Sequence, residues 1–304
     1  MQLGLTYIDY GRMGSFPQRN CQMQKEFKIK RASALFNPVA DTPFKVSRSG
    51  IESFVQCPRC FILDRVHGIR QPSGAPFTLN CLVDTLLKKE FDLHRAAGTP
   101  HPLMAREGID AIPFPHPMLD EWRQNFKGMG YLHEPTNLWI RGAIDDLWVN
   151  PAGEVIVVDY KATSSATKEP SLDDDWKIQY KRQADVYQWL ARRQGLKVSD
   201  TAYFVYANGL HLERFDECMH FSMSVLPYVG NDAWVESKIF EIDAALRSGV
   251  VPPPTLNCEH CGYVNAMVGM AACLTSDEAE ADIKVISKCL LSWLPVALWR
   301  VRPK

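Results

Sequence analysis

Residues 138 to 161 read LWIRGAIDDLWVNPAGEVIVVDYK and predict two strands joined by a turn. The first predicted strand, Leu138 to Asn150, is rich in Trp, Ile, Val and Leu, and Pro151-Ala152-Gly153 is a turn signal. The second, Glu154 to Lys161, contains four consecutive apolar residues, Val155 to Val158. Such a run is typical of a strand that is buried on both faces.

Three charged residues lie at one end of this hairpin. Asp159 and Lys161 are two residues apart, and side chains alternate along a strand, so both point to the same side. Asp145 lies late in the first predicted strand, where the hairpin can place it beside them. Two nearby carboxylates repel each other unless a cation joins them, and hard oxygen ligands suit Mg²⁺ or Mn²⁺. The alternative is a surface hairpin with an Asp–Lys ion pair.

With a divalent cation at the carboxylates, Lys161 would face the attacking water and the scissile phosphate. It would orient or deprotonate that water, or offset the developing charge, as metal-assisted phosphodiester hydrolysis requires.

Helices are expected on both sides of the hairpin along the chain. Thr78 is a suitable cap for a helix from Leu79 to about Ala97, in which Asp84 lies beside apolar positions. After the hairpin, Asp174 to Gln194 fits a helix that ends at Gly195. One face of this second helix carries Trp176, Tyr180, Gln183, Tyr187 and Leu190 at helical spacing.

The order of these motifs resembles the RecB-like branch of the PD-(D/E)xK nucleases. That family has a Gly-x-x-Asp strand, a hydrophobic strand ending in Asp-x-Lys, and a following helix with Gln-x-x-x-Tyr. Here the three motifs are Gly142 to Asp145, Asp159 to Lys161, and Gln183 to Tyr187. The resemblance covers roughly Ser49 to Tyr263. It implies an α/β, restriction-endonuclease-like core with a central mixed sheet flanked by helices.

The resemblance also implies a role for each site residue. Asp145 and Asp159 would bind the metal, with the carbonyl of Tyr160 as a further ligand, and Lys161 would be the catalytic lysine. Gln183 and Tyr187 lie one helical turn apart and would face the active site, to hold the DNA or the catalytic groups. Packing in the core is the alternative for Gln183 and Tyr187.

The sequence departs from the family on the early helix. Many RecB-like nucleases carry a histidine there as an extra metal ligand, whereas the comparable position here is Asp84. An aspartate can also bind a hard cation, so Asp84 is a candidate ligand, and a helix-surface carboxylate is the alternative. Glu90 and Glu134 are weaker candidates.

Four of the nine cysteines form two Cys-x-x-Cys pairs, Cys57/Cys60 and Cys258/Cys261. The odd total and the absence of a secretory signal argue against a disulfide framework. Each pair can give two thiolates to one ion or cluster. A site closed by both pairs would clamp the two ends of the domain together.

Some RecB-like nucleases, including those of CRISPR adaptation and the AddB type, carry a four-cysteine iron–sulfur cluster at this place. Their usual pattern is one early and three late cysteines, so here either Cys60 or Cys273 would supply the remaining ligand. The resemblance favours a [4Fe–4S] cluster. The two-plus-two split also suits tetrahedral Zn²⁺, and four unrelated thiols are a third interpretation.

The net charge of −1 over 304 residues provides no global basic field for nucleic acid. Any DNA-binding surface must therefore be a local patch. Basic residues on the second helix could hold phosphates, while Trp176 and Tyr180 could stack on unpaired bases. A solvated helix face with an apolar core stripe is the alternative. With no secretory signal and no apolar run long enough to span a bilayer, a soluble, cytoplasmic protein without a membrane partner is expected.

Together these features predict a Mg²⁺- or Mn²⁺-dependent deoxyribonuclease that hydrolyses phosphodiester bonds. The resemblance favours exonuclease action on single strands or ends, and a recombination or CRISPR-adaptation protein as partner. The alternatives are a non-catalytic DNA-binding or recombination-partner subunit on the same fold, and a zinc-stabilised structural module. The expected organisation is a lead-in (1–48), a nuclease domain (49–265) and a tail (266–304).

Overall fold

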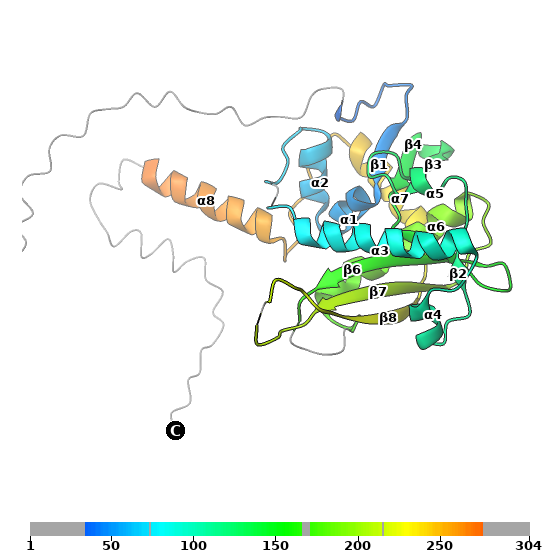
Figure 1. Cartoon of the computed structure of the whole chain (residues 1–304). Coiled ribbons are helices and arrows are strands. Elements are labelled where there is room, and N and C mark those ends of the chain that lie inside the picture. The colour runs from blue at the N-terminus through cyan, green and yellow to red at the C-terminus, as the bar shows by residue number, and fades with distance from the viewer. Residues whose placement is uncertain (1–33, 73, 166–170, 215, 276–304) are drawn as a thin grey trace, which may run out of the picture.

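A five-stranded mixed sheet forms the centre of the computed structural model, which describes residues 34–72, 74–165, 171–214 and 216–275 (Figure 1). Within this sheet, only the pairing of strand Val155–Thr163 with strand Thr201–Gly209 is parallel. The strands in spatial order are β2 (Ile112–Pro113), β5 (Asp146–Val149), β6 (Val155–Thr163), β7 (Thr201–Gly209) and β8 (Phe221–Val229). This arrangement, with helices on both faces, confirms the predicted α/β fold with a mixed sheet.

Helix α3 (Thr78–Ala97) packs on one face of this sheet and α6 (Ile178–Arg193) on the other. Side chains of β6 alternate between the two sides. Ile156 and Val158 join the apolar cluster under α3, while Val155 and Val157 join the cluster under α6. The run of four apolar residues is therefore buried on both faces, as predicted. The same alternation directs Asp159 and Lys161 toward α6.

A second sheet of three strands lies beside the first, in the order β1-β4-β3. Its strands are β1 (Phe44–Ser47), β3 (Met129–His133) and β4 (Leu138–Gly142). The prediction of one strand from Leu138 to Asn150 is wrong, because β4 and β5 belong to different sheets.

Strand pairing ends at Ala143, and hydrogen bonds to Trp122 and Arg123 replace those of the sheet. The N–H of Ile144 donates to the carbonyl of Trp122 at 3.2 Å, and Arg123 Nε donates to the carbonyl of Asp145 at 3.0 Å. Asp145 therefore lies between the two sheets.

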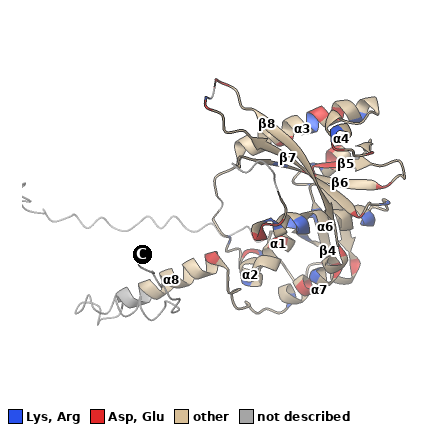
Figure 2. Cartoon of the chain, turned by 90° about the horizontal axis from the view of Figure 1, so that it is seen from below, with Lys and Arg blue, Asp and Glu red and all other residues tan. Residues whose placement is uncertain are grey.

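The remaining helices surround these sheets. Ser47 caps α1, because its Oγ accepts a hydrogen bond from the N–H of Gly50 at 3.1 Å. Helix α8 extends away from the body of the molecule in Figures 1 and 2. Their bounds are α1 (Arg48–Gln56), α2 (Pro58–Arg65), α4 (Pro102–Arg106), α5 (Leu119–Trp122), α7 (Ala233–Arg247) and α8 (Glu259–Thr275), with 3₁₀ turns η2 (Glu134–Thr136) and η3 (Asp175–Lys177).

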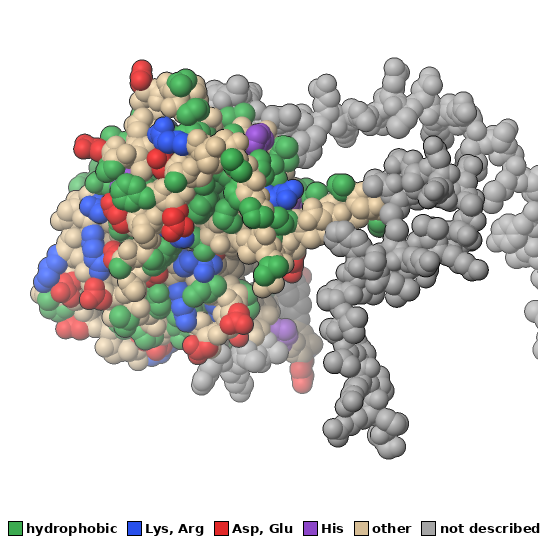
Figure 3. Space-filling model, turned by 180° about the vertical axis from the view of Figure 1, so that it is seen from behind, with side chains coloured by type: hydrophobic (Ala, Val, Ile, Leu, Met, Phe, Trp, Pro, Cys, Tyr) green, Lys and Arg blue, Asp and Glu red, His purple; other side chains and the backbone are tan. Residues whose placement is uncertain are grey.

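The division into lead-in, nuclease domain and tail stays a prediction. Strand β1 lies within the expected lead-in, and α8 crosses the expected boundary at residue 265. Residues 1–33 and 276–304 lie outside the described residues. Acidic and basic side chains are interspersed on the face seen in Figure 3, in keeping with the near-zero net charge. No described helix combines the length and apolar character that crossing a bilayer requires.

Candidate active site and cysteine cluster

Asp159, Lys161 and Gln183 meet at the end of β6. The carboxylate of Asp159 is 1% exposed; Gln183 Nε2 donates to its Oδ1 at 2.6 Å, and Lys161 Nζ forms an ion pair with its Oδ2. Lys161 Nζ also donates to Gln183 Oε1 at 3.4 Å. The Gln183 amide thus serves both charged groups, with its nitrogen toward the carboxylate and its oxygen toward the ammonium group.

Tyr187 lies one turn further along α6 and completes this group. Gln183 Nε2 donates to the Tyr187 hydroxyl at 3.3 Å. The Tyr187 ring packs on Gly142, where an added Cβ would lie 2.6 Å from a ring carbon. Glycine is therefore required at position 142 for the close approach of α6.

Asp145 faces the same region from the gap between the sheets. Its Oδ2 accepts a hydrogen bond from the N–H of Tyr160 at 3.0 Å, and its Oδ1 accepts one from Lys88 Nζ at 3.2 Å. Lys88 Nζ also donates to Asp84 Oδ2 at 2.8 Å. Asp84 is therefore connected to Asp145 through an ammonium group. Sequence reasoning missed Lys88, although its position four residues after Asp84 on one helix was a usable signal.

The carboxylates lie close enough to shift one another's proton affinity. Burial raises the pKa of Asp159 to about 6; Lys161 opposes this rise and Asp145 adds to it. Burial and the charge of Asp145 also raise the pKa of Asp84. Burial alone would lower the pKa of Lys161, but Asp159 and Asp145 hold it above its usual value. Lys161 is therefore a cation at neutral pH.

A buried ion network behind this site holds the start of β5. Asp146 is fully buried, and its Oδ1 accepts hydrogen bonds from Arg95 Nη2 at 2.5 Å and Arg123 Nη2 at 2.9 Å. The Tyr160 hydroxyl donates to its Oδ2 at 2.6 Å. Arg123 also binds the carbonyl of Asp145, so the network sets the position of that residue. Neither arginine nor Asp146 was singled out from the sequence, because no local motif marks them.

The oxygen donors fit a hard divalent cation in chemistry and charge. However, the carboxylates of Asp84, Asp145 and Asp159 do not lie as close together as the ligands of a single ion. Among the described residues, only the four cysteines form such a compact group. Lys88 and Lys161 balance the carboxylate charge instead. The weaker candidates lie elsewhere: Glu90 pairs with His101, and Glu134 begins η2.

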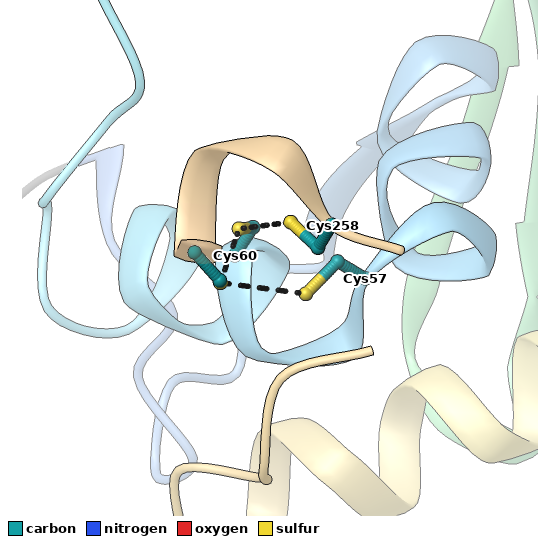
Figure 4. A group of neighbouring side chains, drawn as sticks. Cys57, Cys60 and Cys258 are labelled. Atoms are coloured by element: carbon teal, nitrogen blue, oxygen red, sulfur yellow. Dashed lines mark hydrogen bonds between the residues drawn. The ribbon is translucent and has the colours of Figure 1, made fainter. Parts of the chain in front are cut away.

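The four cysteine sulfurs of Cys57, Cys60, Cys258 and Cys261 all lie within 4.8 Å of one another. Figure 4 shows three of them pointing toward a common centre, between α2 and the start of α8. The cluster thus joins the N-terminal and C-terminal regions, as predicted, and its fourth member is Cys60. The side chain of Cys273 lies outside the described residues.

The thiols of this cluster differ in proton affinity. Burial raises the pKa of Cys57, but hydrogen bonds from the backbone of Thr255 and Cys60 outweigh it and lower the pKa to about 6. Burial raises the pKa of Cys60, and it raises that of Cys261 to about 11. Four thiolates cannot form here without a cation, which is the arrangement that a bound metal stabilises.

A comparison with protein families identifies the fold independently. Residues 79–266 match the family model described as the PD-(D/E)XK nuclease superfamily. The chain belongs to this superfamily. The matched segment is more than half of the chain and contains every proposed active-site residue and the later cysteine pair, but it begins after Cys60. No curated protein matches the chain. Members of the superfamily are typically metal-dependent phosphodiesterases.

Three arginines on α6 of this PD-(D/E)XK protein are already paired. Arg182 binds Glu52, Arg192 binds Asp200 and Asp232, and Arg193 binds Glu236. The predicted phosphate-binding role of the α6 basic face therefore has little support from these contacts.

The two aromatic residues near the start of α6 are arranged differently. Trp176 is 58% exposed and meets Tyr180 edge-to-face, with ring centroids 5.5 Å apart. Lys161 Nζ lies 4.5 Å from the centroid of the Tyr180 ring.

Proposed function

We propose that this protein is a Mg²⁺- or Mn²⁺-dependent deoxyribonuclease of the RecB-like branch, which hydrolyses phosphodiester bonds. The observation that carries the proposal is that Asp145, Asp159 and Lys161 lie together beside the central strand β6, with Gln183 bridging the last two. A buried carboxylate beside a second one raises the free energy of the metal-free protein. A divalent cation between them would offset that cost.

Asp145, Asp159 and the carbonyl of Tyr160 would hold the metal, which would polarise the phosphate and acidify a water molecule. Lys161 remains protonated, so it would offset the negative charge that develops on the phosphate rather than accept a proton. Gln183 would keep the Asp159 carboxylate in one orientation. Tyr187 would keep Gln183 in place through the hydrogen bond to its hydroxyl.

Asp84 would join the site indirectly. In the structure Lys88 stands between Asp84 and Asp145, so direct ligation by Asp84 requires Lys88 to move. We propose that Asp84 sets the position of Lys88 and through it the charge beside Asp145.

The cysteine cluster would hold a [4Fe–4S] centre, as the family resemblance implies, with Zn²⁺ as the alternative. Its support is the compact group of four sulfurs, which come from the residue before α2, from α2, from the residue before α8 and from α8. An absorption spectrum and the iron and zinc content of anaerobically purified protein distinguish the two metals.

Action on single strands or ends, and a recombination or CRISPR-adaptation partner, also rest on the resemblance. Exonuclease action predicts cleavage of linear but not closed circular DNA.

The deciding experiment is cleavage of end-labelled DNA in Mn²⁺ by wild type and Lys161→Ala. We expect the variant to lose about 10²- to 10⁴-fold in rate while remaining folded, because Lys161 acts on the reacting phosphate. Lys197→Ala is the matched control, since its side chain is 64% exposed and its ammonium group contacts only the Glu154 carboxylate and the Ala152 carbonyl among the described residues. Cleavage by Lys161→Ala at the wild-type rate would refute the assignment.

A non-catalytic DNA-binding subunit is the second candidate. It is favoured by Lys88 and Lys161, which already neutralise the carboxylates without a metal. Wild-type protein that binds DNA but does not cleave it in Mn²⁺ or Mg²⁺ would support this second function.

A further inference from the structure

A cavity of about 530 Å³ opens beside Lys161, and it is lined by Trp176 and Tyr180, for which the sequence predicted stacking on unpaired bases. It lies between the ends of β6 and β7 on one side and the segment from Ser171 to Tyr180 on the other. We propose that this cavity binds one unpaired nucleotide of a DNA strand, with the base against Trp176 and Tyr180 and the phosphate toward Lys161. The inference rests on the proposed nuclease function and adds the kind of strand that the site accepts.

The position of the cavity ties it to the reacting phosphate. Lys161 of β6 and Tyr206 of β7 are register partners, so their side chains lie next to each other on the α6 face of the sheet. Both line the cavity. A nucleotide bound there is therefore a direct neighbour of the phosphate that Lys161 would contact.

Two aromatic side chains form a stacking surface on one wall. Trp176 lies in the 3₁₀ turn η3 just before α6, is 58% exposed, and packs edge-to-face against Tyr180. Lys161 Nζ lies over the Tyr180 ring. An indole at the rim of a cavity offers its face to a flat, uncharged ring, and every base has such a face.

Tyr206 supplies an independent observation that points to a ligand. Its side chain is 3% exposed, and its hydroxyl has no hydrogen-bond partner among the described residues. Buried hydroxyl groups without a partner are rare in folded proteins. The hydroxyl oxygen itself is covered in this structure, so a sugar or base atom in the cavity would become its partner only when the lining groups move on binding.

The charges around the cavity fit a base better than a run of phosphates. Its charged lining residues are Lys161, Lys177 and Asp174, and Lys177 pairs with Asp174 at 2.8 Å. Asp173 and Asp175 are the neighbours of Asp174 in the chain, and their negative charges would repel a phosphate. The volume accommodates a single nucleotide, and a base inside a duplex must leave its stack to enter.

The test measures binding and not cleavage. A labelled single-stranded oligothymidylate and a blunt duplex of equal length are titrated by fluorescence anisotropy without added divalent cation. We expect Trp176→Ala to weaken single-strand binding about tenfold without changing the dependence on salt, because stacking is lost while phosphate contacts remain. Duplex binding should change less than twofold.

Tyr206→Phe keeps the ring and removes only the unpaired hydroxyl. We expect severalfold weaker single-strand binding with no loss of melting temperature, since no hydrogen bond of the described structure is removed. The matched control is Phe240→Ala, an aromatic residue of α7 that is 47% exposed and lines no part of this cavity. It should bind both DNAs like wild type.

The inference is overturned if Trp176→Ala and Tyr206→Phe bind oligothymidylate as Phe240→Ala does, or if wild type binds no single strand. These outcomes leave the nuclease function to be judged by the Lys161→Ala cleavage assay. Conversely, the cavity variants could bind single strands more weakly while the wild type does not cleave DNA. That result would support the nucleotide-binding cavity and refute the nuclease function.

Discussion

The acidic centre and the cysteine cluster both gather groups that repel one another when ionised, but they balance the charge differently. In the acidic centre the chain supplies its own cations: Lys88 pairs with Asp84 and Asp145, and Lys161 pairs with Asp159. The thiols interact instead with other sulfurs, with backbone N–H groups and with the Gln71 side chain. From this difference we predict that the acidic centre folds without a metal, whereas the cysteine cluster needs one to fold stably.

The largest expected effect is therefore at the cysteines. Cys258→Ser should lower the free energy of unfolding by about 5 kcal/mol or more, because loss of the bound metal opens the link between α2 and α8. Thermal melting and metal content check this. Cys218→Ser is the matched control, since Cys218 is exposed and outside the cluster. If both variants melt like wild type, the cluster does not hold the fold together.

The next effect concerns the ion network behind the acidic centre. Asp146→Asn should cost about 3–5 kcal/mol, because it removes the buried carboxylate that Arg95 and Arg123 share and leaves them only the partly exposed Asp92. Urea unfolding measures the loss. Asp200→Asn is the control, since Asp200 forms an ion pair with Arg192 but its own side chain is 83% exposed. An equal, small effect for both variants would show that the network does not set the position of β5.

The acidic centre should also have a pH signature in metal-free protein. The pKa of Asp159 is raised by burial to about 6, above its unfolded value of about 4, so the folded state holds this proton more tightly. The stabilisation is present below about pH 4 and is lost as the pH rises to about 6. Asp159→Asn should therefore become progressively more stable than wild type over that range, by up to about 3 kcal/mol.

Melting curves of both proteins in chelator from pH 4 to 8 test this sign. A stability difference that stays constant with pH, or that shrinks between pH 4 and 6, would contradict the raised pKa. If the difference is abolished by Mn²⁺, the cation takes over the charge of this carboxylate.

The smallest effect is expected at Lys88. Lys88→Met removes the ammonium group between Asp84 and Asp145, so Mn²⁺ should bind more tightly by about 1 kcal/mol. Calorimetric titration with Mn²⁺ measures the change. Lys89→Met, the next residue on α3 with an exposed side chain, is the matched control. Weaker Mn²⁺ binding by the Lys88 variant would mean that this lysine supports the metal site rather than competing with it.

Local patterns predicted part of the local geometry around the proposed site. The turn at Pro151–Gly153 and the apolar run before Asp159 identified the β5–β6 hairpin, because strand alternation is a property of adjacent residues. The spacing of Gln183 and Tyr187 on one helix predicted that they lie together, and they do. The break between β4 and β5 could not be predicted, since it depends on Trp122 and Arg123, about twenty residues earlier in the chain.

By itself the sequence determined the helices α3 and α6, the hairpin that carries Asp159 and Lys161, and the two cysteine pairs, because periodicity and short spacings are local. The tertiary structure decided that Cys60 completes the cluster, that Lys88 stands between Asp84 and Asp145, and that Asp146 anchors the start of β5. Each of these contacts depends on groups that are dozens of residues apart in the chain. Which charges share a buried space is therefore set only when the sheet and its helices pack together.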